Sequence, residues 1–157
     1  EASTYLRAVH GMDRGRTRDV DFAFHRRVLA VAREAVRAGW ARSAHDCAEG
    51  GLAVAVAESA VAGGVGAEIV VPGFGRRDAA LFGEAPSRIV LSVPAAAAPA
   101  LFALAAQWNA PVTVLGRVGG TRLRIAVAGA TRPRRWDLDL SCDELRAAYD
   151  ALAEVFA

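Results

Sequence analysis

The stretch Ser43–Ala62 constrains the fold of this chain more than any other. Ser43–Asp46 is a short run that can form a strand, a polar turn with paired Gly50 and Gly51 follows, and residues 52–62 suit an apolar helix. Such a turn brings backbone N–H groups and the positive end of a helix dipole to one spot, where an anion can bind. Paired glycines also occur where a helix simply packs closely on a strand. The pattern therefore predicts an α/β unit and leaves the role of the glycines open.

The composition and charge of the chain limit the classes of protein to which this motif can belong. The chain has 157 residues, of which 54% are hydrophobic and 23% charged, enough for one domain with a sizeable core. Its net charge is only +2, and its 19 basic residues, all arginines, are spread along the chain rather than gathered in the basic stripe of a nucleic-acid binder. No apolar run reaches the roughly 18 to 20 residues of a membrane helix, and the first residues do not resemble a secretory signal. We expect a cytoplasmic protein that binds neither nucleic acid nor membrane.

Residues that often hold metals or form disulfides are sparse. The two cysteines, Cys47 and Cys142, have no second Cys or His at metal-binding spacing, so we interpret them as reduced thiols. The chain also lacks a Gly-rich Walker loop and an acidic metal cluster. We therefore predict no metal site on this chain.

The part of the chain before the motif divides into a lead-in and a helix. Residues 1–20 contain a glycine stop and a polar run, and we interpret them as an extended lead-in. Residues 21–38 have apolar side chains at three- and four-residue steps, which predicts a helix capped by Asp21 with Val36 on its buried face. His25 lies among charged residues at the start of this helix, and we expect it to be solvated.

The part after the motif alternates between strand-like and helix-like segments. Gly119 and Gly120 separate two β-branched runs and predict a hairpin with one solvated face. Ser141 and Glu144 form a capping box before the last helix. The predicted elements are strand 67–72, a short helix or turn near 79–82, strand 89–93, a helix that begins near residue 99, strands 112–118 and 122–127, strand 136–140 and a C-terminal helix.

Three charged residues outside the turn have competing interpretations. Glu58 is the only charge in the apolar helix, and we expect it to pair with an arginine at the helix end rather than to point into a site. Glu84 and Arg88, by their spacing alone, predict a surface ion pair that contributes about 0–1 kcal/mol. On the residues alone, none of the three is assigned to a functional site.

The motif also resembles a known family. Residues 43–58 read SAHDCAEGGLAVAVAE and are similar to the signature SAHDxSDGGLAVALAE in the last domain of the phosphoribosylformylglycinamidine synthases, the large-subunit type of purine biosynthesis. The chain departs from the signature at Cys47, Ala48 and Glu49, and the loss of a serine at Ala48 removes one possible phosphate donor. Weaker similarities lie in Ser3–Leu6 with His10 and Gly11, in Leu81–Arg88 and in Val114–Val118.

The resemblance implies a fold and a domain organisation. Domains of this aminoimidazole-ribonucleotide-synthetase-like superfamily are α/β (α+β) sandwiches in which a mixed β-sheet packs with helices, as in the C-terminal domain of aminoimidazole ribonucleotide synthetase. Residues 1–20 would then lead in from a preceding domain that is not part of this chain. Residues 21–157 would form a single C-terminal-type α/β domain.

The resemblance also implies an activity for the complete enzyme. That activity converts formylglycinamide ribonucleotide to the amidine, with ATP and with ammonia derived from glutamine. ATP and Mg²⁺ would be bound mainly by domains absent here, so we expect no cofactor on this chain alone and no activity of the isolated domain. The implied partners are the preceding ATP-binding domains of the same polypeptide, a glutaminase and small accessory subunits.

Within the motif, the resemblance implies a substrate-binding site. Gly50 and Gly51 would bring the backbone close to a phosphate or ribose, while His45 and Asp46 would bind substrate or fix the loop. No residue is assigned a catalytic role, because His45 and Asp46 are neighbours on a strand and point to opposite faces. The residues expected to support these groups from behind are Glu49, Glu84 and Arg88.

Three alternatives remain open at this level. The chain could be the equivalent domain of a related ATP-dependent enzyme that makes aminoimidazole ribonucleotide, selenophosphate or a thiamine phosphate. It could be a noncatalytic scaffold that holds neighbouring domains or a glutaminase. It could also be a stand-alone anion-binding module. Binding of substrate or ATP to the isolated domain would argue against the pure scaffold.

Overall fold

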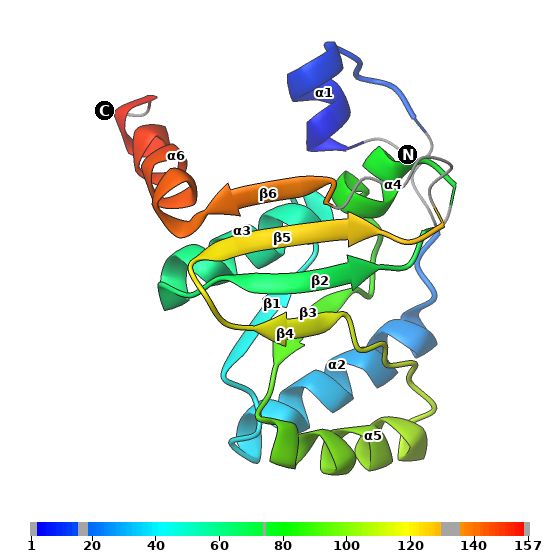
Figure 1. Ribbon diagram of the computed structural model, residues 1–157. Helices are drawn as coiled ribbons and strands as arrows, with labels where there is room; N and C mark the ends of the chain where they lie inside the picture. Colours follow the sequence, from blue (N-terminus) through cyan, green and yellow to red (C-terminus); the bar gives the residue numbers. More distant parts are fainter. Residues whose placement is uncertain (1–2, 16–18, 74, 130–135, 156–157) are drawn as a thin grey trace.

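Two β-sheets pack with helices in the part of the chain that the computed structural model describes, residues 3–15, 19–73, 75–129 and 136–155 (Figure 1). This arrangement confirms the predicted α/β sandwich with a mixed sheet. The elements in chain order are α1 (Thr4–His10), α2 (Phe22–Arg37), β1 (Ser43–Asp46), α3 (Gly51–Gly63), β2 (Ala67–Val71), α4 (Arg77–Phe82), β3 (Ile89–Ser92), the 3-10 turn η1 (Ala95–Ala97), α5 (Ala98–Gln107), β4 (Gly116–Val118), β5 (Arg122–Val127), β6 (Leu138–Ser141) and α6 (Cys142–Val155).

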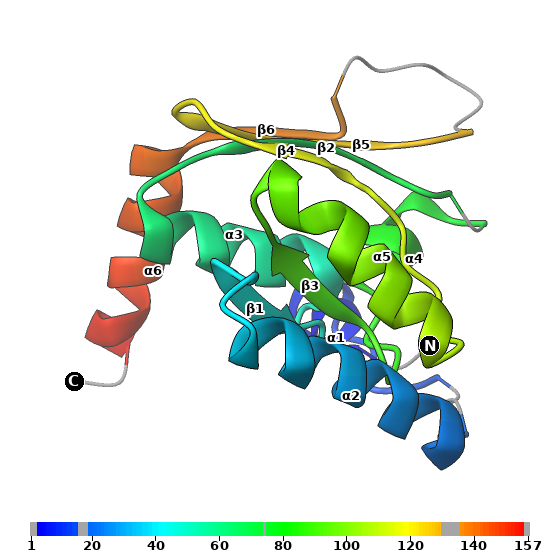
Figure 2. The same cartoon turned by 90° about the horizontal axis from the view of Figure 1, so that it is seen from below.

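The larger sheet has the strand order β4-β2-β5-β6. β2 is parallel to β5 and antiparallel to β4, while β6 is antiparallel to β5. Burial alternates along β2 and β5, so that apolar side chains such as Ile69, Leu123 and Ile125 point to one face. Helices cover that face, and the other face of the sheet is turned away from them (Figure 2).

Helix α3 lies at the centre of the molecule. It packs under the larger sheet, and the antiparallel ribbon of β1 and β3 lies on its other side (Figure 2). Residues from Leu52 to Val61 of this helix are largely buried and form one cluster with the inner face of the sheet and with α4. The prediction that this apolar helix is buried between other elements is confirmed, because a helix without a polar face needs cover on several sides.

Helices α2 and α5 form an outer layer beneath the ribbon (Figure 1). Val31, Ala35 and Leu101 are buried between them in a second cluster. The prediction that Val36 shares this buried face is wrong: its side chain is 53% exposed, since it lies about 100° around the helix from Ala35. His25 is also not simply solvated, because its Nδ1 contacts the Ser87 hydroxyl at 2.9 Å in a half-buried position.

The prediction that residues 1–20 are an extended lead-in is wrong for Thr4–His10, because these residues form helix α1. The Ser3 hydroxyl caps this helix by accepting a hydrogen bond from the Leu6 N–H at 3.3 Å. Gly11, in the left-handed conformation with φ of 62°, ends it. A seven-residue helix with caps at both ends has too few apolar repeats to stand out in the sequence pattern.

The predicted hairpin around Gly119 and Gly120 is wrong, because β2 lies between β4 and β5. The turn at Gly119 and Gly120 instead bonds to Gly66. The Gly66 N–H donates to the Gly120 carbonyl at 2.9 Å, and the Gly119 N–H donates to the Gly66 carbonyl at 2.8 Å. A side chain on Gly66 would collide with the backbone of Arg122. The glycine at position 66 therefore lets the chain at the start of β2 approach β5 closely, and β2 lies between the two strands that the local sequence predicts as a hairpin.

Candidate functional site

The motif folds as a strand, a turn and a helix, as predicted. β1 ends at Asp46, and α3 begins at Gly51. Gly50 and Gly51 have φ of 74° and 68°, a left-handed conformation that residues with a side chain rarely adopt. Both glycines are required by the backbone conformation of this turn.

The N–H groups of the two glycines are already bonded within the chain. The Gly50 N–H donates to Glu84 Oε1 at 2.9 Å, and the Gly51 N–H donates to the Ala48 carbonyl at 3.2 Å. Both glycines are buried. In this structure, the turn therefore presents neither of these amides to a ligand.

Close packing gives the glycines a second purpose. A Cβ on Gly51 would lie 2.8 Å from the Gly83 carbonyl oxygen, which belongs to the backbone and cannot swing away. A Cβ on Gly50 would lie 2.8 Å from the Cβ of Val54, one turn into α3. The turn fits against the end of α4 because Gly51 has no side chain, and against the first turn of α3 because Gly50 has none.

Glu84 supports the turn directly, and its expected ion pair with Arg88 is not formed. Glu84 Oε1 also accepts a hydrogen bond from the Thr4 N–H at 2.7 Å. Partial burial raises the pKa of Glu84, but the hydrogen bonds from Gly50 and Thr4 outweigh it and hold the pKa below its ordinary value. Arg88 instead donates to the Gly83 carbonyl at 3.1 Å and so fixes the same loop from its other side.

His45 is held between two oxygen acceptors. Its Nε2 lies 2.9 Å from Glu58 Oε2, and its Nδ1 lies 2.7 Å from the Asp46 carbonyl oxygen. Each ring nitrogen of His45 thus has an oxygen partner. The prediction that Glu58 pairs with an arginine is therefore wrong. Sequence reasoning missed Glu58 as part of this site, although a lone carboxylate in an apolar helix, seven residues after the glycine turn, was the available signal.

Cys47 follows Asp46 at the end of β1 but is sealed from solvent. Its side chain is buried in the core around α3. Burial raises the pKa of the Cys47 thiol; nearby Arg88 lowers it and Asp46 raises it, and the net shift is upward. Cys47 and Cys142 are both free thiols, as predicted. Because thiolate formation is disfavoured, Cys47 fits a packing role and not that of a nucleophile.

The open groups at this end of the domain are mainly acidic. The Asp46 side chain is 70% exposed, and Glu49 in the turn is also exposed. His45 is one-third exposed. Carboxylates at an open edge can accept hydrogen bonds from hydroxyl groups or attract a cation, whereas they repel a free phosphate. No group of three potential metal-binding side chains occurs in the described residues.

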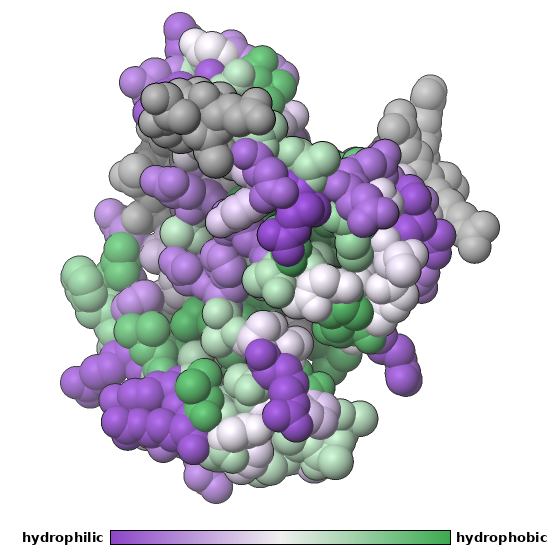
Figure 3. Space-filling view, turned by 90° about the vertical axis from the view of Figure 1, so that its left-hand side faces the viewer, coloured by the Kyte–Doolittle hydropathy of each residue, from purple (hydrophilic) through white to green (hydrophobic). Residues whose placement is uncertain are grey.

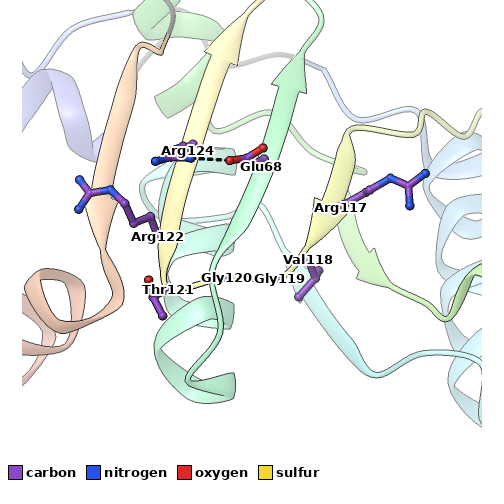
Figure 4. A pocket seen from close by; sticks show the side chains of 8 residues that line it. All are labelled: Glu68, Arg117, Val118, Gly119, Gly120, Thr121, Arg122 and Arg124. Atoms are coloured by element: carbon purple, nitrogen blue, oxygen red, sulfur yellow. Dashed lines mark hydrogen bonds and ion pairs between the residues drawn. The ribbon is translucent and has the colours of Figure 1, made fainter.

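A hollow of about 400 Å³ on the outer face of the larger sheet is a second candidate. Strand register places Arg117, Glu68, Arg124 and Asp139 in one row across the sheet. Arg124 pairs with Glu68 at 2.6 Å, and Arg122 pairs with Asp139 at 2.6 Å. Figure 4 shows the side chains of Arg117 and Arg122 pointing to opposite sides. Such a ladder of alternating charges suits the solvated face predicted for these strands and does not converge on one anion.

Comparison with known proteins identifies the family. Residues 1–128 match the family described as AIR synthase related protein, C-terminal domain, and the chain belongs to this family. Solved structures share the fold: the "Structure of PurLQS from Thermotoga maritima" matches with a TM-score of 0.69 over 82% of this chain and 22% of that chain, at 16% identity. "T. maritima PurL complexed with FGAR" matches with a TM-score of 0.64 over 78% of this chain and 21% of that chain, at 17% identity.

Curated relatives are more similar in sequence. The phosphoribosylformylglycinamidine synthase subunit PurL of Moorella thermoacetica is 44% identical over 82% of this chain and 18% of its own length. The subunit of the same name from a Synechococcus strain is 48% identical over 74% of this chain and 16% of its own length. The chain thus spans less than a fifth of these relatives. None of its described helices is long and apolar enough to span a membrane.

Proposed function

We propose that this chain is the C-terminal domain of a phosphoribosylformylglycinamidine synthase. The complete enzyme would convert formylglycinamide ribonucleotide to the amidine, with ATP and ammonia from glutamine. The observation that carries the proposal is 44% identity over 82% of the chain to a synthase subunit of that name. ATP and Mg²⁺ would be held mainly by other domains, with no cofactor on this chain alone. We propose a cytoplasmic location for the enzyme.

The β1 edge would form one wall of the substrate cleft. Asp46 and His45 would contact the substrate, and the exposed carboxylate of Asp46 suits a ribose hydroxyl better than a phosphate. Gly50 and Gly51 would place these side chains through the shape of the turn, since their amides are occupied. Behind them, the residues proposed to hold the turn are Glu49, Glu84 and Arg88.

A hybrid enzyme tests the proposal. The matching segment of the Moorella thermoacetica subunit is replaced by this chain, and amidine formation is measured with its other subunits present. We expect an active hybrid and no activity from the chain alone. Asp46→Asn should raise the KM for the ribonucleotide severalfold, while Asp150→Asn, an exposed control on α6, should leave it unchanged. An inactive but folded hybrid would contradict the proposal.

The alternative functions predict different outcomes in the same experiment. A noncatalytic scaffold would support activity in the hybrid, but Asp46→Asn would then leave the KM unchanged. The equivalent domain of a related enzyme of the superfamily would fold in the hybrid but fail with formylglycinamide ribonucleotide. The proposed partners, which are the preceding ATP-binding domains, a glutaminase and small accessory subunits, enter the experiment with the Moorella protein.

A further inference from the structure

Helix α1 is fastened to the rest of the domain through few contacts. None of its residues is buried. The Tyr5 ring stacks on the Phe82 ring, with centroids 4.5 Å apart and planes within 4°. At the start of the helix, the Thr4 N–H donates to Glu84 Oε1 at 2.7 Å. The position of α1 therefore depends largely on the short segment from Phe82 to Glu84.

The same segment holds the motif turn. Glu84 Oε1, the oxygen that accepts from Thr4, also accepts the Gly50 N–H at 2.9 Å. One residue earlier, the Gly83 carbonyl lies so close to Gly51 that a Cβ there would be 2.8 Å from it. A single carboxylate oxygen thus joins α1 to the turn that carries the proposed substrate-binding edge.

We propose that Glu84 is a positioning residue that couples the docking of α1 to the shape of the Gly50–Gly51 turn. With α1 docked, two backbone donors fix the carboxylate in place. With α1 displaced, the carboxylate loses the Thr4 donor, so it is free to turn toward water and release Gly50. Docking of α1 and order in the turn therefore stabilise each other.

The coupling matters for function because the turn sets the edge of β1. His45 and Asp46 lie immediately before the turn, and their contact with substrate rests on the proposed function. A movement of α1 would then change how these side chains meet the substrate. The site would be regulated by whatever holds or displaces α1.

Amide hydrogen exchange in the 157-residue chain tests the coupling without any activity. Tyr5→Ala removes the ring stack but touches neither Glu84 nor Gly50. We expect exchange of the Thr4 and Gly50 amides to accelerate together, by about tenfold or more. Faster exchange at Thr4 with Gly50 unchanged would overturn the proposal.

Two further variants keep this test decisive. Glu84→Ala should accelerate both amides, whereas Asp150→Asn, which neutralises an exposed carboxylate on α6, should leave both unchanged. Unchanged exchange at Val31 and Ala35, in the separate core between α2 and α5, would show that the variants remain folded. If Tyr5→Ala unfolds the chain, Glu84→Ala decides the test. Exchange at Thr4 and Gly50 as slow in Glu84→Ala as in the parent chain would overturn the proposal.

The hybrid enzyme separates this inference from the proposed function. Tyr5→Ala should raise the KM for formylglycinamide ribonucleotide severalfold with a smaller change in kcat, because it disturbs the position of a binding edge. An unchanged KM together with coupled exchange would overturn the link to substrate. An inactive hybrid would contradict the proposed function, while the exchange measurements would still decide the coupling.

Discussion

Two of the paired-glycine turns in this chain look alike in sequence but have opposite surroundings. At Gly50–Gly51 both residues are buried, both amides are bonded, and an added Cβ would meet neighbouring atoms on either residue. At Gly119–Gly120 both residues are exposed, and no heavy atom lies within 4 Å of an added Cβ. The first pair is needed for packing and conformation together, while the second is needed only for conformation.

The difference bears on how each turn can act. A buried turn with bonded amides is a rigid support, so a ligand at that end of the domain meets side chains such as Asp46 instead of backbone donors. The open turn lies beside the hollow, but Arg122 and Arg124 near it are paired with Asp139 and Glu68. Neither turn therefore behaves as the phosphate cradle that a glycine pair suggests.

The strongest test of the comparison is Gly51→Ala. The new Cβ would meet the Gly83 carbonyl oxygen and force a residue with φ of 68° to carry a side chain. Backbone strain and overpacking each cost about 1–3 kcal/mol, so we expect the free energy of unfolding to fall by about 2–6 kcal/mol. Urea unfolding of the chain measures this change. A loss below about 1 kcal/mol would mean that the turn is not tightly packed.

Much of the fold could be predicted because it follows from local patterns. The apolar run of α3, the alternation in β5 and the capping box at Ser141 and Glu144 each determine one element by themselves. The pairing of strands could not be predicted in this way. Whether β4 meets β5 or β2 depends on close backbone approaches of Gly66 to Arg122 and of Gly116 to Glu68, which join segments far apart in the sequence.

The candidate site divides in the same manner. Residues 43–58 predicted the strand, the turn and the start of the helix. The same residues indicated the family. The contacts of Glu58 and Glu84 were not visible, because each joins segments that only the tertiary structure brings together. Spacing suggested arginine partners for both carboxylates, since nearby opposite charges are the commonest surface arrangement. Their actual partners are a histidine on β1 and two backbone amides.

Acid is expected to lower the stability of the chain by less than Gly51→Ala does. The pKa of Glu84 is held below its ordinary value in the folded chain, so its contribution to stability is fully present above the pKa of the unfolded state and is lost as the pH falls through the folded pKa. We expect stability to fall below about pH 4, the ordinary range of a glutamate. Urea midpoints are compared at pH 7 and pH 3.

Other carboxylates with lowered pKa, such as Asp139 and Glu144, contribute to the same loss. Glu84→Gln isolates the share of Glu84, because an amide cannot titrate in this range. The variant should be less stable than the parent chain at pH 7 and should lose less stability on acidification. Identical acid sensitivity in the two chains would show that the carboxylate does not secure the buried turn.

The smallest effect is expected from Gly120→Ala in the open turn. Gly120 has φ of 71°, close to the value at Gly51, so an alanine there carries a similar conformational strain. Because no atom lies within 4 Å of the new Cβ, the overpacking found at Gly51 is absent. We expect a loss of about 1 kcal/mol, the cost of placing one residue with a side chain in the left-handed region. If Gly120→Ala lowers the free energy of unfolding as much as Gly51→Ala does, the left-handed conformation alone explains both glycine pairs. Close packing around Gly51 would then contribute little to stability.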